Sequence, residues 1–249
     1  MNRARANEGV ICPHLRISEN DGGGMAEDSS LTASNVMSRK RRHDAMTDDS
    51  LAGKHIFVTG GAQGLGLAVA CMVARRGAAR VAIADRNEDR KAEVESQIAA
   101  LGAQCLYIVC DAAHPDQIKE AVALVDGHFG GIDGLVNCVG DTRRGTLEST
   151  TVELWDAQLA VNLRAPFLFT QAVSAIMRRG RGGSIVNIAS VQSRGGLTFC
   201  MAYAAAKAGL VCLTRNNAAE LAKDGIRVNA INMGWCLTDN EHSLQVAGD

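Results

Sequence analysis

The sequence predicts an α/β protein built on a doubly wound parallel sheet, and three observations predict it. From residue 51 onward, short apolar segments alternate with longer segments of helical period. The short segments carry apolar residues at consecutive positions, which is typical of parallel strands buried on both faces. A glycine-rich turn joins the first strand to the first helix. Because strand–helix–strand crossovers are right-handed, a doubly wound sheet is the simplest topology for this order.

The first half of the pattern contains three strands, each followed by a helix. The predicted strands are His55–Thr59, Arg80–Ala84 and Gln104–Cys110, and the predicted helices are Leu65–Arg76, Glu88–Leu101 and Pro115–His128. The second helix is charged and amphipathic and ends at Gly102. The third begins with a proline, which the first turn of a helix tolerates because its N–H has no partner there.

The second half repeats the pattern with longer helices. The predicted strands are Asp133–Val139, Ser184–Ala189 and Ile226–Ile231, and the predicted helices are Val152–Arg179 and Met201–Lys223. Pro166 should bend or strain the first of these helices, because proline has no N–H to donate to the preceding turn. Gly225 ends the second. The chain therefore provides six predicted strands.

Composition excludes several classes of function. The 249 residues are 47% hydrophobic and 21% charged, with a net charge of −1, so no basic field favours a nucleic acid partner. No run of about 18 apolar residues predicts a membrane span. The eight cysteines include no Cys-x-x-Cys pair, which favours reduced thiols and a cytoplasmic setting. The six histidines lack ligand spacing, so no metal site is expected.

The chain divides near residue 50. Residues 1–50 are rich in glycine, serine, asparagine and charge without a sustained apolar period, and we expect a disordered tail. Arg39–Arg42 is a short basic run that is better explained by a solvated tail than by a nuclear address. Residues 51–249 should form one α/β domain.

A phosphate-binding turn is predicted between the first strand and the first helix. Thr59–Gly66 reads Thr-Gly-Gly-Ala-Gln-Gly-Leu-Gly, with glycines at a Gly-x-x-x-Gly-x-Gly spacing. Glycines let the backbone approach a pyrophosphate at a helix N-terminus. The candidate cofactor contacts of this turn are Gly60, Gln63, Gly64, Leu65 and Gly66.

Asp85 ends the second strand about twenty residues later, where a carboxylate binds ribose hydroxyls and repels a 2′-phosphate. This position favours NAD over NADP. Arg86 leaves NADP open, because a guanidinium there could bind the phosphate. Asp111 and Ala112 follow the third strand, where they would meet the adenine; a loop cap is the alternative role for Asp111.

Three further residues predict hydride transfer to or from an alcohol carbon. Tyr203 and Lys207 are four apart on a helix and therefore share one face. A phenol is a poor base near neutral pH, but a neighbouring ammonium favours its ionised form. Ser190, thirteen residues before Tyr203, would hold the substrate oxygen. Together these residues supply the acid/base that alcohol oxidation needs.

The combined motifs resemble those of the short-chain dehydrogenase/reductase family, whose fold is Rossmann-type, over about residues 51–240. The matching residues are Thr59–Gly66, Asp85, Asp111, Asn137 to Gly140, Asn162, Ser190, Tyr203, Lys207, Gly234 and Thr238. The resemblance implies that Tyr203 is the acid/base, that Ser190 orients the substrate, and that Lys207 binds the nicotinamide ribose. It also implies that Asn162 holds a water for a proton relay and that Asn137, Gly140 and Thr238 contact the cofactor.

Three departures and one alternative qualify the resemblance. Val139 and Met233 replace the usual alanine and proline of their motifs. The family also continues about fifty residues past this chain's last motif, through a seventh strand, so the dinucleotide-binding catalytic domain expected over residues 51–249 is short at its C-terminus. A truncated, catalytically silent NAD-binding protein is therefore the alternative. The substrate is expected to be a small secondary alcohol or ketone, with a polyol or a sugar as the favoured class. Arg143 and Arg144 could attract an anionic substrate, although loop arginines are usually only solvated. The long helices predict a homodimer or homotetramer.

Overall fold

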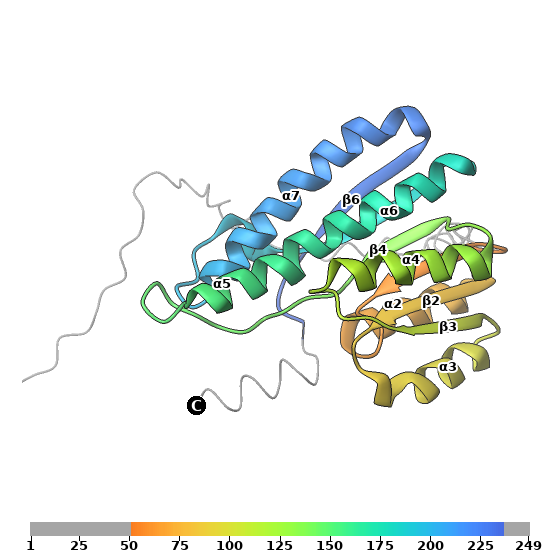
Figure 1. Cartoon of the computed structure of the whole chain (residues 1–249), viewed down its shortest axis with the longest axis horizontal. Helices are drawn as coiled ribbons and strands as arrows, with labels where there is room; N and C mark the ends of the chain where they lie inside the picture. Colours follow the sequence, from red (N-terminus) through yellow and green to blue (C-terminus); the bar gives the residue numbers. More distant parts are fainter. Residues whose placement is uncertain (1–50, 237–249) are drawn as a thin grey trace, which may run out of the picture. The chain divides into compact units, whose positions relative to one another are not determined.

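The structure, a computed structural model, describes residues 51–236. The predicted tail and Thr238 lie outside the described residues. Figure 1 shows a twisted sheet between helices. The six strands have the order β3-β2-β1-β4-β5-β6 and are all parallel. Their bounds are β1 His55–Thr59, β2 Arg80–Asp85, β3 Gln104–Val109, β4 Gly134–Asn137, β5 Gly183–Ser190 and β6 Ile226–Met233. The predicted doubly wound parallel sheet is confirmed.

The strand order reverses beside β1, and this reversal positions the site. The chain moves outward from β1 through β2 to β3, and then returns to β4 on the other side of β1. The connections after β1 and β4 therefore diverge at the carboxyl ends of the strands. In open α/β sheets this divergence opens a ligand-binding crevice.

Helices cover the two faces of the sheet unequally. Helices α2 (Gly64–Arg75) and α3 (Lys91–Ala100) pack on one face, with Val58, Ile83 and Ile98 in the core between them. The other face is covered by α4 (Pro115–Phe129), α6 (Ala165–Arg179) and α7 (Met201–Leu221). Phe57 and Phe169 meet edge-on in this second core, with ring centroids 5.7 Å apart. Figure 1 shows α6 and α7 running side by side along β6.

The predicted helix 152–179 is interrupted just before its proline. It consists of α5 (Val152–Leu159), a π-helical segment (Ala160–Arg164) and α6. Pro166 lies in the first turn of α6, and its missing N–H is the donor that the carbonyl of Asn162 would use in a regular α-helix. At this place the helix widens into the π turn.

The same helical run bears on the expectation that no segment is apolar enough to span a membrane. By length and apolar composition alone, Val152–Arg179 would be able to cross a membrane, and 50% of its most apolar stretch is buried inside the fold. Val173 and Met177 of α6 are fully or almost fully buried in the core. The apolar residues of this run thus serve the packing of α6 on the sheet.

Element ends differ from the prediction by a few residues. Strand β4 ends at Asn137, and the next residue, Cys138, lines a cleft at the carboxyl ends of the strands. Strand β6 extends to Met233 because all eight of its residues pair with β5. Among the described strands, β6 has this one neighbour and ends the sheet.

Candidate active site

A cleft of about 720 Å³ lies at the carboxyl ends of β1 to β4. It collects most residues that the sequence singles out for cofactor binding. They are Gly60, Gln63, Gly64, Leu65, Gly66, Asp85, Arg86, Asp111, Ala112, Gly140, Tyr203 and Lys207. These residues come from five separate loops or helices, so the sheet topology brings them together.

The glycine turn leaves room for a phosphate group because side chains are excluded from it. Gly60 has φ +67°, and a Cβ there would lie 2.8 Å from the backbone of Val139. A Cβ on Gly66 would lie 2.0 Å from the carbonyl oxygen of Gly60. Helix α2 begins at Gly64 with no side-chain cap from Gln63, so its first N–H groups are available to an anion. The turn fits the pyrophosphate of a dinucleotide.

Asp85 lines the cleft beside the glycine turn, and its carboxylate is fixed in orientation. One carboxylate oxygen accepts a hydrogen bond from the Ala62 N–H at 3.0 Å, and the other accepts from the Asn87 N–H at 3.0 Å. A carboxylate has about four acceptor positions, so both oxygens can still accept ribose hydroxyls. The Asp85 carboxylate can accept hydrogen bonds from the hydroxyls of a dinucleotide ribose, and the guanidinium groups of Arg86 and Arg90 line the same cleft.

Asn137 has a different position from the one expected. Its side chain is buried away from the cleft and donates to Asn187 Oδ1 at 2.8 Å. Asn187 in turn donates to Thr214 Oγ1 at 2.9 Å. The side chain of Asn137 therefore joins β4 to β5 and, through Asn187, to α7. Asn137 does not line the cleft whereas its neighbour Cys138 does, because side chains at successive positions of a strand point to opposite faces.

Lys207 is nearly fully buried beneath Tyr203. Its ammonium donates to the carbonyl of Ile188 at 2.7 Å and lies 5.6 Å from the centroid of the Tyr203 ring. Burial lowers the pKa of Lys207 from its ordinary 10.5 to about 8. Burial also raises the pKa of the neighbouring Cys138 thiol to about 12, so this thiol is neutral. The predicted shared face of Tyr203 and Lys207 is present, with a cation beside the phenol.

A second, smaller cavity of about 230 Å³ adjoins the cleft. Ser190, Gln192 and Phe199 line this cavity but not the cleft, whereas Tyr203 lines both. Ser190 is buried at the end of β5, and its Oγ accepts from the Gln192 N–H at 3.2 Å. The phenol of Tyr203 is therefore at the junction between a dinucleotide-sized cleft and a cavity suited to a small molecule.

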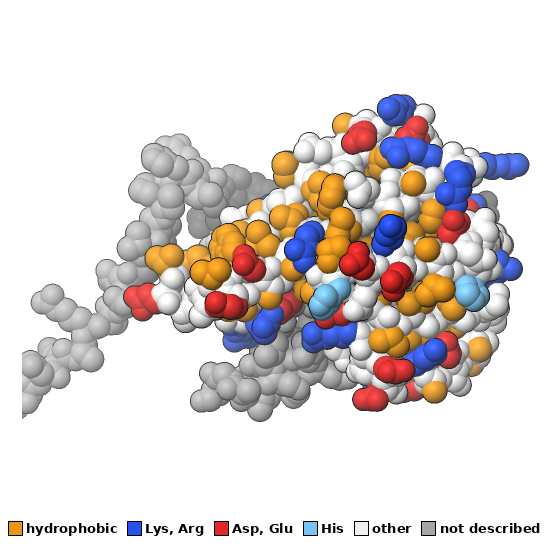
Figure 2. Space-filling view, in the orientation of Figure 1, with side chains coloured by type: hydrophobic (Ala, Val, Ile, Leu, Met, Phe, Trp, Pro, Cys, Tyr) orange, Lys and Arg blue, Asp and Glu red, His pale blue; other side chains and the backbone are white. Residues whose placement is uncertain are grey.

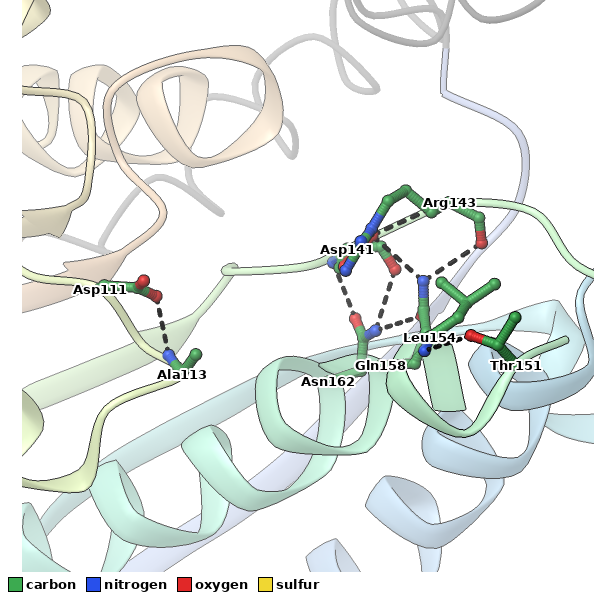
Figure 3. Close-up of polar contacts among 8 residues, drawn as sticks. All are labelled: Asp111, Ala113, Asp141, Arg143, Thr151, Leu154, Gln158 and Asn162. Atoms are coloured by element: carbon green, nitrogen blue, oxygen red, sulfur yellow. Dashed lines mark hydrogen bonds and ion pairs between the residues drawn. The ribbon is translucent and has the colours of Figure 1, made fainter. Parts of the chain in front are cut away.

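Asn162 belongs to a hydrogen-bonded network in the wall of the cleft (Figure 3). Its Oδ1 accepts from the Asp141 N–H at 3.1 Å, and its Nδ2 donates to the Asp141 carbonyl at 2.9 Å and to Gln158 Oε1 at 2.8 Å. Gln158 Nε2 completes the ring through Asp141 Oδ1 at 3.1 Å. These contacts use both N–H donors of the Asn162 amide and one acceptor position of its oxygen, so the side chain holds the loop after β4, and Asn162 does not line the cleft.

Sequence reasoning missed several residues of this wall. Asp141 lines the cleft and is paired with Arg143, whose Nε donates to Asp141 Oδ2 at 2.9 Å. Burial acts to raise the pKa of Asp141, but the hydrogen bonds from Arg143 outweigh it and hold the pKa below its usual value. Asp141 follows the carboxyl end of β4, so its position just after a predicted strand could have marked it as a residue of the cleft. Nothing in the sequence around Gln158 indicates that it belongs to the same wall.

Comparison with known protein families shows to which family this chain belongs. The family model described as short chain dehydrogenase matches residues 54–247. The chain belongs to the short-chain dehydrogenase/reductase family. Curated relatives agree: D-threitol dehydrogenase of Mycolicibacterium smegmatis is 37% identical over 195 residues, which are 78% of this chain and 75% of that enzyme. The 5-keto-D-gluconate 5-reductase of Escherichia coli is 35% identical over 195 residues, 78% of this chain and 76% of that enzyme.

Solved structures of short-chain dehydrogenases resemble this one and contain both forms of the cofactor. An NAD⁺-bound xylitol dehydrogenase has a TM-score of 0.76 at 30% identity, covering 80% of this chain and 76% of the other. A short chain dehydrogenase from Burkholderia cenocepacia in complex with NADP has a TM-score of 0.73 at 38% identity, covering 77% and 78%. This short-chain dehydrogenase/reductase is therefore a member of a family that uses nicotinamide dinucleotides.

Proposed function

We propose that this protein transfers a hydride between NAD(H) and the reacting carbon of a small secondary alcohol or ketone, with Tyr203 as the acid/base. One observation carries the proposal: Tyr203 lines both the dinucleotide-sized cleft and the small cavity that contains Ser190. A proton donor at that junction can serve an alcohol oxygen in the small cavity while hydride moves from or to the cleft.

The roles of the side chains follow from their chemistry. When bound, the nicotinamide dinucleotide supplies the hydride acceptor for oxidation or the hydride donor for reduction. Tyr203 takes the hydroxyl proton of the alcohol during oxidation and returns it to the ketone oxygen during reduction. Ser190 donates a hydrogen bond to the same oxygen and orients it. The Lys207 ammonium favours the ionised form of the phenol, since an opposite charge nearby stabilises it.

Asn162 has a positioning role in this proposal. The side chain of Asn162 holds the backbone of Asp141. The backbone carbonyl of Asn162 is therefore the group that we propose to bind a water. Pro166 cannot donate the regular helical hydrogen bond to that carbonyl, because proline lacks an N–H. The π-helical segment thereby supports the proton relay that the family resemblance implies.

NAD is the proposed cofactor, with NADP as the less favoured one. The carboxylate of Asp85 is held by two backbone N–H groups with acceptor positions left for ribose hydroxyls. A 2′-phosphate would be repelled by this carboxylate. Arg86 and Arg90, which line the same cleft, are the residues that would favour NADP instead.

A polyol or sugar is the proposed substrate class. Two relatives are named for a sugar alcohol and a sugar acid, and the cavity beside Ser190 has the size for such molecules. We further propose a cytoplasmic homodimer or homotetramer. A catalytically silent NAD-binding protein is not favoured, because Ser190, Tyr203 and Lys207 are all present and buried or half-buried at one junction.

Replacing Tyr203 by phenylalanine tests the proposal. NADH and NADPH should be titrated into wild type and Tyr203→Phe, and both should then be assayed with a panel of alditols, aldoses and ketoses. We expect tighter binding of NADH than of NADPH by wild type. We also expect turnover to fall by about 10²- to 10⁴-fold in the variant while NADH binding is retained, because only the proton transfer is lost.

Two results would contradict the proposal. Equal turnover by wild type and Tyr203→Phe would remove Tyr203 from the chemistry. Tighter binding of NADPH than of NADH would overturn the role given to Asp85, and it would leave the acid/base assignment standing.

A further inference from the structure

A buried amide oxygen without a hydrogen-bond partner belongs to the wall of the small cavity. Gln192 lines this cavity together with Ser190 and Tyr203. The Oε1 atom of Gln192 is buried, and none of the described residues donates a hydrogen bond to it. Folded proteins pair nearly all of their buried polar atoms, because a buried acceptor has lost its water and needs another donor. A molecule bound in the cavity is in the position to supply the donor that Gln192 Oε1 lacks.

The backbone around Gln192 is fixed on both sides. Gln192 lies in the short turn Val191–Arg194, which directly follows β5, and the preceding Ser190 pairs with Met233 of β6. The Gly195 N–H donates to the Gln192 carbonyl at 2.8 Å, and Gly195 has φ +75°, which glycine adopts without strain. Only side-chain torsions are therefore left to aim the amide. The terminal torsion of glutamine is broad, so the oxygen can turn toward a ligand in the cavity.

Ser190 and Gln192 offer complementary groups to such a ligand. Ser190 Oγ accepts from the Gln192 N–H at 3.2 Å, and its own O–H has no acceptor among the described residues. The two residues thus provide one free donor, the Ser190 O–H, and one free acceptor, Gln192 Oε1. A substrate with oxygens on two adjacent carbons matches this pair. Its reacting oxygen accepts from Ser190 and exchanges a proton with Tyr203, while the hydroxyl on the next carbon donates to Gln192.

We propose that Gln192 accepts a hydrogen bond from a substrate hydroxyl on the carbon next to the reacting one. The enzyme then prefers vicinal diols and α-hydroxy ketones to analogues in which a methyl group replaces that hydroxyl. This inference rests on the proposed function and narrows its substrate class. An analogue without the hydroxyl would leave the buried oxygen of Gln192 unpaired, and sites built to bind a hydroxyl reject such analogues for this reason.

The test compares ketones that differ in one hydroxyl group. Wild type and Gln192→Met should be assayed with NADH and two matched pairs, hydroxyacetone with butanone and acetoin with methyl isopropyl ketone. In each pair a methyl group replaces the hydroxyl, so the size of the molecule is kept. Gln192→Met keeps the length of the side chain and removes the acceptor. We expect the ratio of kcat/KM for the hydroxy ketone to that for the plain ketone to fall by about tenfold or more in this variant.

Three controls show whether the acceptor atom is responsible. Methoxyacetone keeps the oxygen of hydroxyacetone without its hydrogen, so wild type should reduce it no better than butanone; this comparison needs no variant. Gln192→Glu keeps an acceptor oxygen at the same length and should retain a ratio close to that of wild type. Gln104→Met changes an exposed glutamine at the start of β3 that lines neither cavity, and its ratio should equal that of wild type.

A binding measurement gives a second readout that needs no turnover. Propylene glycol and sec-butanol, which differ by the same exchange of hydroxyl for methyl, should be titrated into the enzyme–NADH complex. Cofactor and alcohol are both reduced in that complex, so no hydride can move. We expect wild type to bind the glycol about tenfold or more tightly than sec-butanol, and Gln192→Met to lose this difference.

The possible outcomes separate this inference from the proposed function. A binding preference for the glycol that Gln192→Met abolishes, without reduction of any ketone, would support the role of Gln192 and contradict the proposed function. Reduction of ketones with equal ratios in wild type and Gln192→Met would support the proposed function and overturn this inference. Reduction of methoxyacetone as efficient as that of hydroxyacetone, or no binding preference for the glycol in wild type, would also overturn it.

Discussion

At the scale of single residues, burying the ammonium of Lys207 lowers the stability of the folded protein by an amount that depends on pH. Its exposed fraction is 3%, and burial lowers its pKa to about 8, so the folded protein pays a penalty for protonating it. The penalty is fully present below about pH 8. It is relieved as the pH rises from about 8 toward the ordinary value of 10.5, because in that range the unfolded chain binds the proton and the folded protein does not.

Lys207→Met should therefore change stability in a way that depends on pH. Relative to this variant, we expect wild type to gain up to about 3 kcal/mol in free energy of unfolding between about pH 8 and pH 10.5, using about 1.4 kcal/mol per pKa unit. Chemical denaturation of both proteins from about pH 7 to pH 9.5 measures the rising part of this difference. A difference that stays constant with pH would mean that Lys207 titrates outside this range.

At the scale of elements, the turn between β1 and α2 depends on two glycines that contact each other. The carbonyl oxygen of Gly60 occupies the space where a side chain on Gly66 would begin. The Gly60 N–H is bonded to the Ala84 carbonyl of β2 at 2.8 Å, so the turn cannot move away freely. The same close packing keeps the N-terminus of α2 open to a phosphate.

Gly66→Ala should consequently destabilise the fold and weaken cofactor binding. We expect a loss of about 1–3 kcal/mol in free energy of unfolding, as for other overpacked core sites, and NADH affinity reduced about tenfold or more. Gly127→Ala is the matched control, since Gly127 lies inside α4 with no atom within 4 Å of the added Cβ. That control should be stabilised by about 0.5–1 kcal/mol. Denaturant melts measure the free energy of unfolding of the two variants, and titration measures their NADH affinity. Equal values for Gly66→Ala and Gly127→Ala would show that a Cβ at Gly66 does not disturb the turn.

At the scale of the whole molecule, large apolar side chains are exposed on α5 and α6. Trp155 is 41% exposed and Phe167 is 39% exposed, and Val152 at the start of α5 is 71% exposed. Figure 2 shows hydrophobic side chains gathered at the end of the surface that carries α5. Exposed apolar side chains that lie together mark association surfaces. They support the proposed assembly of identical subunits.

Phe167→Glu should shift this assembly toward monomers. A carboxylate placed in an apolar interface loses its water without gaining a partner, so association should weaken by about tenfold or more. Sedimentation velocity at several protein concentrations measures the change. Met72→Glu, at a side chain 49% exposed on α2, is a control of similar exposure on a different helix and should leave the assembly unchanged. A wild type that is monomeric at all concentrations would contradict the proposed homo-oligomer.

Much of the fold and site was predictable because it depends on local geometry. Strand and helix periods are properties of neighbouring residues, so all six strands were predicted with small errors at their ends. The pairing of Tyr203 with Lys207 follows from helix pitch alone, and the open turn from the glycines of Thr59–Gly66. The family resemblance depended on these same local motifs.

Contacts between distant segments could not be predicted in this way. Asn137 and Cys138 are neighbours in sequence, but the first is buried between strands and the second lines the cleft. Nothing in the sequence indicates which of them faces the site, because that depends on the packing of each side of the sheet. The ring of hydrogen bonds among Asp141, Gln158 and Asn162 likewise joins a loop to a helix about twenty residues away.

The order of strands and helices, the phosphate-binding turn and the residues able to move a proton can all be predicted from the amino-acid sequence, since each is encoded within a few neighbouring positions. The folded protein was needed to find that Tyr203 lines two cavities, and that Arg143 lines one while Arg144 lines the other. A cavity is bounded by several distant segments at once, and the packing of the whole sheet fixes how they meet.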